Sequence, residues 1–214
     1  MRGPVCIFAL PLLLSGAVIL DRIAVIAGNH AIKLSDVDRD VRLTEFINGE
    51  PLKLSAADKR AAAERLITQD IIRQAIITGG YRRPPDSEGA DLLAQIRRDR
   101  FGNSDRRMRE ALERYGVTEA ELQERLLWQI TVLQFINQRF RAGVIVTSED
   151  VRNYYAQHAA ELRKEYPHAS LEVMTPKIKD AIEGERVNKN FDDWLDQTRQ
   201  GYRVDYEQGA FESP

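Results

Sequence analysis

His158 and Glu161 are the two residues whose types and spacing come closest to a reactive site. They lie one turn apart in an expected helix, and an imidazole and a carboxylate can both bind a metal ion. The chain has only 3 histidines, and they are scattered along the sequence. We therefore interpret the two residues as an ordinary surface pair, and we expect no metal site and no cofactor.

Motifs that mark common enzyme classes are missing from the sequence. It has no G-x-S-x-G nucleophile turn, no glycine-rich phosphate loop and no H-E-x-x-H pair. Helix capping and solubility account for neighbouring carboxylates such as Asp36, Asp38 and Asp40. The single cysteine, Cys6, lies in a segment that we expect to be removed, which leaves no thiol in the mature chain. We expect a protein that is not an enzyme.

Four aromatic side chains on expected amphipathic helices are candidates for binding another polypeptide. They are Trp128, Phe135, Tyr154 and Tyr155. Aromatic rings offer a large apolar area and are enriched where proteins contact one another. The alternative is that these rings belong to the protein's own core, because aromatic residues on amphipathic helices often do.

The N-terminal segment favours export from the cytoplasm. The apolar run Val5–Leu20 is 16 residues long and contains Pro11, so it is too short and too interrupted for a good membrane span. Ser15-Gly16-Ala17 supplies the small residues that an export peptidase reads. We predict a signal peptide over residues 1–17, a periplasmic mature chain over 18–214 and no stable membrane span after cleavage. An uncleaved membrane anchor is the alternative.

The charge pattern gives no reason to expect a nucleic-acid partner. The formal net charge is −2, and the charged residues, 30% of the chain, mix both signs. A cluster of arginines between residues 97 and 109 is interrupted by acids, which is typical of a solvated helix face. Its members are Arg97, Arg98, Arg100, Arg106, Arg107 and Arg109.

The hydrophobic pattern predicts a mainly α-helical fold with a small β-sheet. A hairpin over about 22–34 leads into helices over about 36–48, 56–78, 88–100, 119–141 and 176–199, with further helices over 108–115 and 151–162. The sequence also repeats a helix-start signal, a hydroxyl residue followed by an acid or a proline. It occurs at Ser35 with Asp38, Ser55 with Asp58, Thr118 with Glu121, Thr147 with Asp150, and Thr175 with Pro176.

The C-terminal segment Tyr202–Tyr206 alternates with period two, as a strand with one exposed face does. A lone strand is not stable and needs a partner. The N-terminal hairpin is the obvious one. We therefore predict that both ends of the mature chain meet in one small sheet that closes a multi-helix body.

Several segments, taken in order, resemble the SurA family of periplasmic chaperones. The opening Leu20–Asp38 resembles the hairpin that leads into the first helix of that family, and Val144–Tyr155 is similar to the segment that there precedes a parvulin-type prolyl isomerase domain. The other similar segments are Leu66–Ile77 with Gly79-Gly80, Phe101-Gly102, Tyr115–Thr118, and Phe191–Leu195 with Tyr202–Tyr206.

The chain departs from the family where the isomerase domain would stand. About twenty residues separate Tyr155 from Thr175, whereas a parvulin domain needs about 90, close to the lower end of domain sizes. The resemblance thus implies a chaperone core without that domain, with an N-terminal part over 18–146 and a C-terminal part over 147–214.

The resemblance implies a periplasmic protein that binds unfolded or partly folded polypeptides, among them outer-membrane proteins in transit. A reduced peptidyl-prolyl isomerase and a membrane-tethered structural subunit are the two alternatives. The sequence leaves the oligomeric state and the identity of the clients open.

Overall fold

Helices make up most of the part of the chain that the structure, a computed structural model, describes, namely residues 21–167 and 169–212. The predicted signal peptide, residues 1–17, lies outside these ranges. The elements in chain order are β1 (Ile23–Ala27), β2 (His30–Lys33), α1 (Leu34–Asn48), α2 (Ala56–Thr78), α3 (Asp86–Phe101), α4 (Asp105–Tyr115), α5 (Glu119–Phe140), α6 (Ser148–Gln157), α7 (Ala159–Glu165), α8 (Leu171–Gln200) and β3 (Val204–Tyr206). The predicted mainly α-helical fold with a small sheet is confirmed.

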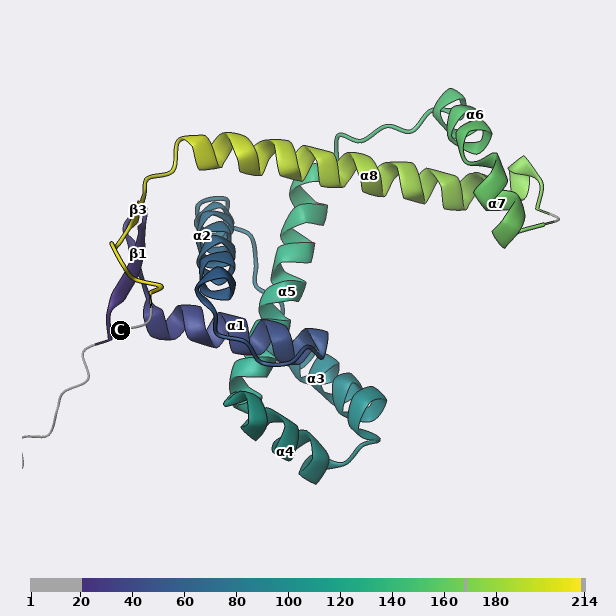
Figure 1. The fold of residues 1–214 in the computed structure, drawn as a ribbon. Coiled ribbons are helices and arrows are strands. Elements are labelled where there is room, and N and C mark those ends of the chain that lie inside the picture. Colours follow the sequence, from purple (N-terminus) through teal and green to yellow (C-terminus); the bar gives the residue numbers. More distant parts are fainter. Residues whose placement is uncertain (1–20, 168, 213–214) are drawn as a thin grey trace, which may run out of the picture.

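The sheet joins the N-terminal hairpin to the C-terminal strand, as predicted. Its strand order is β2-β1-β3, and both pairings are antiparallel. Val25 is paired with Tyr206 and Ala27 with Val204. Figure 1 shows the two ends of the described chain side by side, with β3 against β1. The sheet therefore closes a chain whose other elements are helices.

Gly28, in the hairpin turn, is required by a close approach of the C-terminal segment. Its φ is +57°, a conformation that residues with a Cβ rarely adopt. A Cβ atom there would lie 2.6 Å from the hydroxyl oxygen of Tyr202. The Gly28 N–H also donates to the carbonyl of Arg203, at 2.8 Å. The turn and the closing segment thus fit together only with glycine at this position.

Three of the predicted helix starts are confirmed by their cap hydrogen bonds. Ser55, Thr118 and Thr147 are the N-cap residues of α2, α5 and α6, and each hydroxyl accepts the backbone N–H of the acid three residues later. The distances are 3.2 Å in α2, 3.2 Å in α5 and 3.1 Å in α6. These caps determine where the helices begin.

Two predicted starts are wrong. Helix α1 begins at Leu34, directly after β2, and Asp36 rather than Asp38 accepts the backbone N–H of the cap residue Lys33, at 3.2 Å. The Ser35 hydroxyl donates instead to Asp21. The hairpin runs into the helix without a connecting turn, so the helix starts earlier than the Ser35 pattern indicates.

Helix α8 begins at Leu171 and not at Pro176. Ser170 is its N-cap, with a hydroxyl that accepts the N–H of Val173 at 3.4 Å, and Pro176 lies inside the helix. Met174, Ile178 and Ile182 recur every four residues and are all buried. Burial of that stripe extends the helix by one turn beyond the start that proline predicted.

The predicted helix over 151–162 is divided in two. His158 has φ −101° and ψ 14° and separates α6 from α7. The break lets α7 turn back toward the first half of α8, and residues of α6, α7 and α8 form a small core around Val151, Met174, Ile178 and Ile182. We call residues 142–185 the arm.

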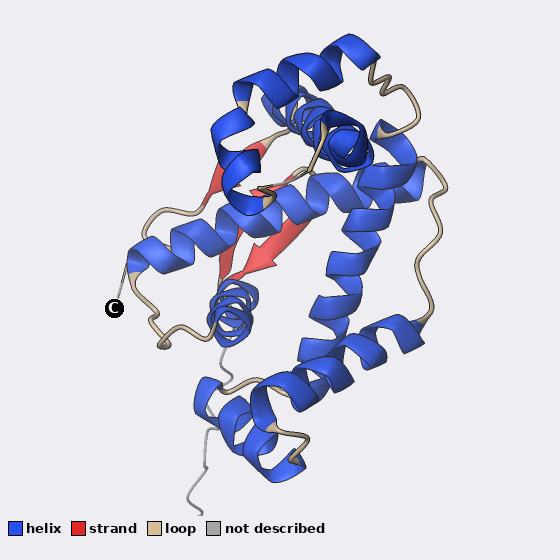
Figure 2. Ribbon diagram, turned by 90° about the vertical axis from the view of Figure 1, so that its right-hand side faces the viewer, coloured by secondary structure: helices blue, strands red, loops and turns tan. Residues whose placement is uncertain are grey.

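The rest of the described chain, residues 21–141 and 186–212, is the body. In Figure 1, α2 and α5 both run between α1 and α8, with α3 and α4 packed at the far end of α5 and the arm at the distant end of α8. Figure 2 looks along α8 from the side of the arm, with the sheet behind the helices. Residues of α2 and α5 line a common hollow.

Candidate functional site

A groove lies between α2 and α5 and consists of two adjoining hollows. The larger, about 640 Å³, is mainly apolar. Its lining residues are Glu64, Arg65, Thr68, Gln69, Ile72, Arg125, Trp128, Gln129, Val132 and Leu133. The smaller, about 560 Å³, is lined mainly by charged residues and is called the charged hollow. Its lining residues are Asp36, Arg39, Asp40, Leu43, Leu66, Gln69, Arg73, Ala120, Glu121, Glu124, Arg125 and Trp128.

The two walls come from helices whose other faces are buried. Ala63 and Ile67 of α2 pack against the sheet and α1, and Leu122 and Leu126 of α5 pack against α1, α3 and α4. The remaining faces point to the groove. There Leu133 is 59% exposed, which is unusual for a leucine in a folded protein. The groove thus offers apolar area that the chain itself does not cover.

Trp128 lies where the two hollows meet and lines both of them. Its ring is partly buried and packs on the cluster formed by Ile72, Ile76 and Phe135. The guanidinium of Arg73 lies over the ring, 5.1 Å from its centroid, in a cation–π arrangement. This places an exposed positive charge directly beside an apolar surface.

Asp40 of α1 holds both walls of the groove. Its side chain is 2% exposed and accepts hydrogen bonds from Arg65 of α2, at 2.7 Å, and from Arg125 of α5. Arg125 also donates to Thr44, at 3.2 Å. A buried carboxylate is stable only when it is paired and hydrogen-bonded, and Asp40 satisfies both conditions. These hydrogen bonds from two helices to one carboxylate fix the spacing between α2 and α5.

The assignment of Asp40 to capping or solubility is therefore wrong. Asp40, Val41 and Thr44 follow Val37 by three, four and seven residues, so all four lie on one face of α1. A carboxylate on a buried face needs a cation from another element. That position on the apolar face is the sequence signal that could have identified it.

The four aromatic candidates separate into two groups. Trp128 lies in the groove, and Phe135 lies beneath it, 1% exposed, with Tyr81, Phe140 and Trp194 around its ring at 5.0, 5.8 and 5.6 Å. The side chains of Tyr154 and Tyr155 pack in the core of the arm instead. They stand apart from the groove.

Comparison with known proteins gives two relatives that share a printed name, Chaperone SurA. The protein from Pseudomonas putida is 26% identical over 199 residues, which cover 88% of this chain and 46% of the relative. The protein from Pseudomonas aeruginosa is 25% identical over 187 residues, which cover 85% and 44%. The chain is SurA-like. No protein-family model matches it.

The SurA-like chain spans about half the length of the curated relatives it matches. The resemblance seen in the order of its segments is confirmed, and it extends over both the body and the arm.

The C-terminal segment of the SurA-like chain is tied to α2 by hydrogen bonds near the groove. The hydroxyl of Tyr202 donates to Asp70, which is buried and also lies 3.2 Å from His30. Burial, and then the hydrogen bond to Asp70, raise the pKa of Tyr202 to about 12. Tyr206 donates to Glu64 in the same way. The closing strand thus supports one wall of the groove.

The arm of the SurA-like chain has a smaller hollow of about 200 Å³ beside Tyr154. His158 stacks on the Tyr154 ring with centroids 4.3 Å apart, and its Nδ1 lies 3.2 Å from Glu161. Within residues 21–167 and 169–212 there is no group of three residues suited to hold a metal ion. In the same ranges no helix is both long and apolar enough to cross a membrane.

Proposed function

We propose that this SurA-like chain is a periplasmic chaperone that binds unfolded or partly folded polypeptides, with outer-membrane proteins in transit among its clients and no prolyl isomerase activity. The observation that carries the proposal is the groove between α2 and α5, with apolar area exposed along a rigid frame. Exposed apolar surface of this kind is typical of sites that bind other proteins.

The groove suits an extended segment of a client. Val132 and Leu133 offer apolar contact on one wall, and Ile72 on the other. Thr68 and Gln129 carry hydroxyl and amide groups that can pair with the N–H and C=O groups of a client backbone. Because such contacts are noncovalent and reversible, the client can be released without an energy source.

The names of the two relatives support the same function, since both are chaperones. The short arm supports the absence of isomerase activity. Between α6 and α8 the described chain holds α7 and its connecting loops, whereas a parvulin domain requires about 90 residues. We also propose that residues 1–17 are a signal peptide, and that 18–146 and 147–214 are the two parts of one core.

An aggregation assay tests the function. At severalfold excess, the purified protein should slow the aggregation of an unfolded outer-membrane protein. Leu133→Asp should weaken this protection, because it places a charge in the apolar hollow. Ile145→Asp is the matched control, since Ile145 is 76% exposed and does not line the groove. No protection by the unaltered chain, or equal losses in the two variants, would rule the proposal out.

Two further measurements separate the alternatives. In a refolding reaction limited by prolyl isomerisation, a slow phase of about 10–100 s should stay unchanged at substoichiometric protein, whereas an isomerase would accelerate it. N-terminal sequencing of the exported chain should give a start at Val18. An intact N-terminus would favour a membrane-tethered subunit instead.

A further inference from the structure

The carboxylates that line the groove are all paired with the protein's own arginines. Each of the five lies within ion-pair distance of at least one arginine. The pairs are Asp36 with Arg39, Asp40 with Arg65 and Arg125, Glu64 with Arg199, Glu121 with Arg39, and Glu124 with Arg83. A basic residue of a client would therefore have to compete with an arginine already in place.

Arg73 is the exception among the charged side chains of the groove. Within the described residues it takes part in none of the ion pairs, and it is exposed in the charged hollow. Its guanidinium lies over the ring of Trp128. The N–H groups of a guanidinium that has no ion-pair partner in the protein are available to bind a carboxylate with two parallel hydrogen bonds.

We propose that Arg73 makes the groove selective for client segments in which an acidic side chain adjoins a run of apolar ones. The apolar residues occupy the larger hollow, and the Asp or Glu carboxylate accepts hydrogen bonds from Arg73 on the other side of Trp128. This inference rests on the proposed function, because it assigns a specificity to the same groove. The ion pairing of the lining residues carries it: among the described residues every carboxylate of the lining has an arginine partner, whereas Arg73 has no carboxylate partner.

Short synthetic peptides test the selectivity. Three acetylated and amidated peptides share one apolar run and differ at a single position, which is Glu, Gln or Lys. Two series place that position before or after the run, so that either chain direction is covered. Affinities for the purified chain are measured by fluorescence anisotropy.

In one series the Glu peptide should bind about threefold to fivefold more tightly than the Gln peptide, as expected of one partly exposed ion pair, and the Lys peptide should bind most weakly. Added salt should reduce the difference, because it screens exposed charges.

Variants of Arg73 identify the residue responsible. In Arg73→Gln the ratio of the Gln-peptide Kd to the Glu-peptide Kd should fall to about one, since the charge that distinguishes the two is gone. Arg73→Lys should keep part of the ratio, because an ammonium retains the charge but not the planar fork. Arg109→Gln is the matched control. Arg109 is exposed on α4, away from the groove, and its loss should leave the ratio unchanged.

The outcomes separate this inference from the proposed function. If none of the peptides binds, the groove is not a polypeptide site and both proposals fail. If all three bind equally, or if Arg73→Gln keeps the preference for Glu, the groove binds polypeptides but Arg73 does not select them. Circular dichroism of each variant verifies that it is folded, and Gln is a good helix former at this exposed position.

Discussion

The body and the arm are stabilised in different ways. The body is cross-linked by hydrogen-bonded carboxylates between distant elements. Asp40 joins α1 to α2 and α5, and Asp70 joins α2 to the start of β2 and to the C-terminal segment. In the described part of the arm four buried side chains form the core, and α8 runs continuously from the arm into the body. The arm resembles a small separate core carried on one long helix.

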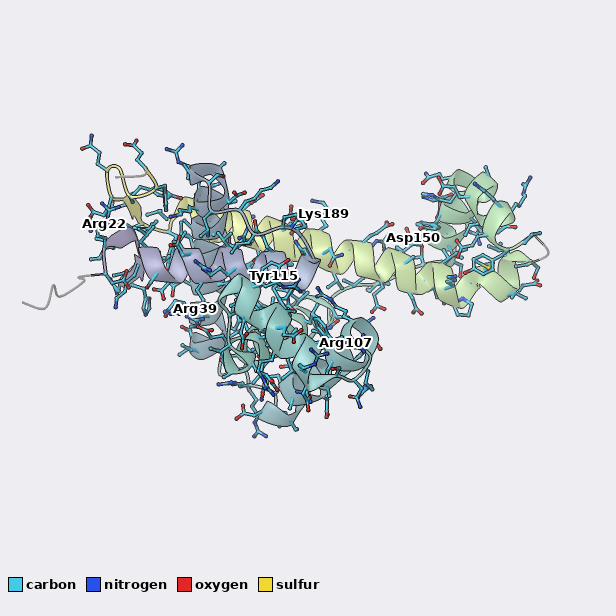
Figure 3. All side chains as sticks on the ribbon, turned by 60° about the horizontal axis from the view of Figure 1, so that its bottom comes forward. Arg22, Arg39, Arg107, Tyr115, Asp150 and Lys189 are labelled. Carbon is cyan, nitrogen blue, oxygen red and sulfur yellow. The ribbon has the colours of Figure 1, made fainter. Side chains whose placement is uncertain are left out.

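Two ion pairs cross between the arm and the body. Arg141 makes two hydrogen bonds to Glu183, at 3.0 and 3.1 Å, and Arg186 binds Asp150 at 2.7 Å. Both pairs are partly exposed, so each contributes little free energy. In Figure 3, Asp150 lies beside α8 at the base of the arm. We therefore expect the arm to open without changing the width of the groove, which the ion pairs of Asp40 hold.

Asp40→Ala should have the largest effect, because it leaves the guanidinium of Arg125, a side chain only 12% exposed, without its carboxylate. We predict a loss of about 3 kcal/mol in the free energy of unfolding, measured with urea, together with weaker peptide binding. Asp196→Ala is the control, since Asp196 is exposed on the body half of α8 and does not line the groove. Equal losses of unfolding free energy in the two variants would mean that the ion pairs of Asp40 do not hold the body together.

Ile178→Ala should open the arm alone. Ile178 is 1% exposed in the arm's core, and removal of its side chain leaves a cavity that costs about 2 kcal/mol. Hydrogen exchange should increase in α6 and α7 and stay unchanged in α1 and α2. Ile67→Ala, in the core beneath the sheet, should instead lower protection throughout the body. If Ile178→Ala also destabilises the body, the two regions fold as one unit.

Tyr202→Phe should cost about 1 kcal/mol, because it removes one hydrogen bond from buried Asp70 while His30 remains beside it. Tyr206→Phe should cost less, since Tyr206 is 46% exposed.

The Tyr202 hydroxyl also gives a pH dependence. The pKa of Tyr202 is raised from an ordinary value of 10.0 to about 12, so its contribution is complete below pH 10 and disappears as the pH rises toward 12. The stability difference between the unaltered chain and Tyr202→Phe should vanish over that range. A constant difference would refute the role of the hydroxyl.

Local signals explain how much of this fold could be predicted from sequence. The helix starts at Ser55, Thr118 and Thr147 depend on residues three positions apart, so the sequence contains all that determines them. The closing strand was predictable because its alternation required a partner and one hairpin was available. The start of α8 was not, because burial of Met174 in the core of the arm outweighs the proline signal.

The groove was only partly predictable, because it also depends on contacts between residues that are far apart in the sequence. Trp128 is aromatic and therefore visible in the sequence, but Thr68 and Gln69 are ordinary polar residues until α5 is placed opposite them. Asp40 takes its role from Arg65 and Arg125, which are 25 and 85 residues away. Phe211 is similar: it is buried against the sheet and α2 from beyond the last strand, where no periodicity predicts burial.

The smallest effect that we predict is a loss of stability of the arm in acid, through Asp150. The Arg186 guanidinium, and then the Thr147 backbone N–H, hold the pKa of Asp150 well below its ordinary value of 3.8. A depressed pKa in the folded state means that the contribution of Asp150 is complete above that ordinary value and is lost as the pH falls toward the folded pKa. Hydrogen exchange in α6 should therefore differ between the unaltered chain and Asp150→Asn at neutral pH, and the difference should shrink only in strong acid. Asp196→Asn, an exposed change on the body half of α8, should show no such difference. If the difference is constant down to strong acid, the ionised carboxylate is not what holds α6 against α8, and the arm depends on its apolar core alone.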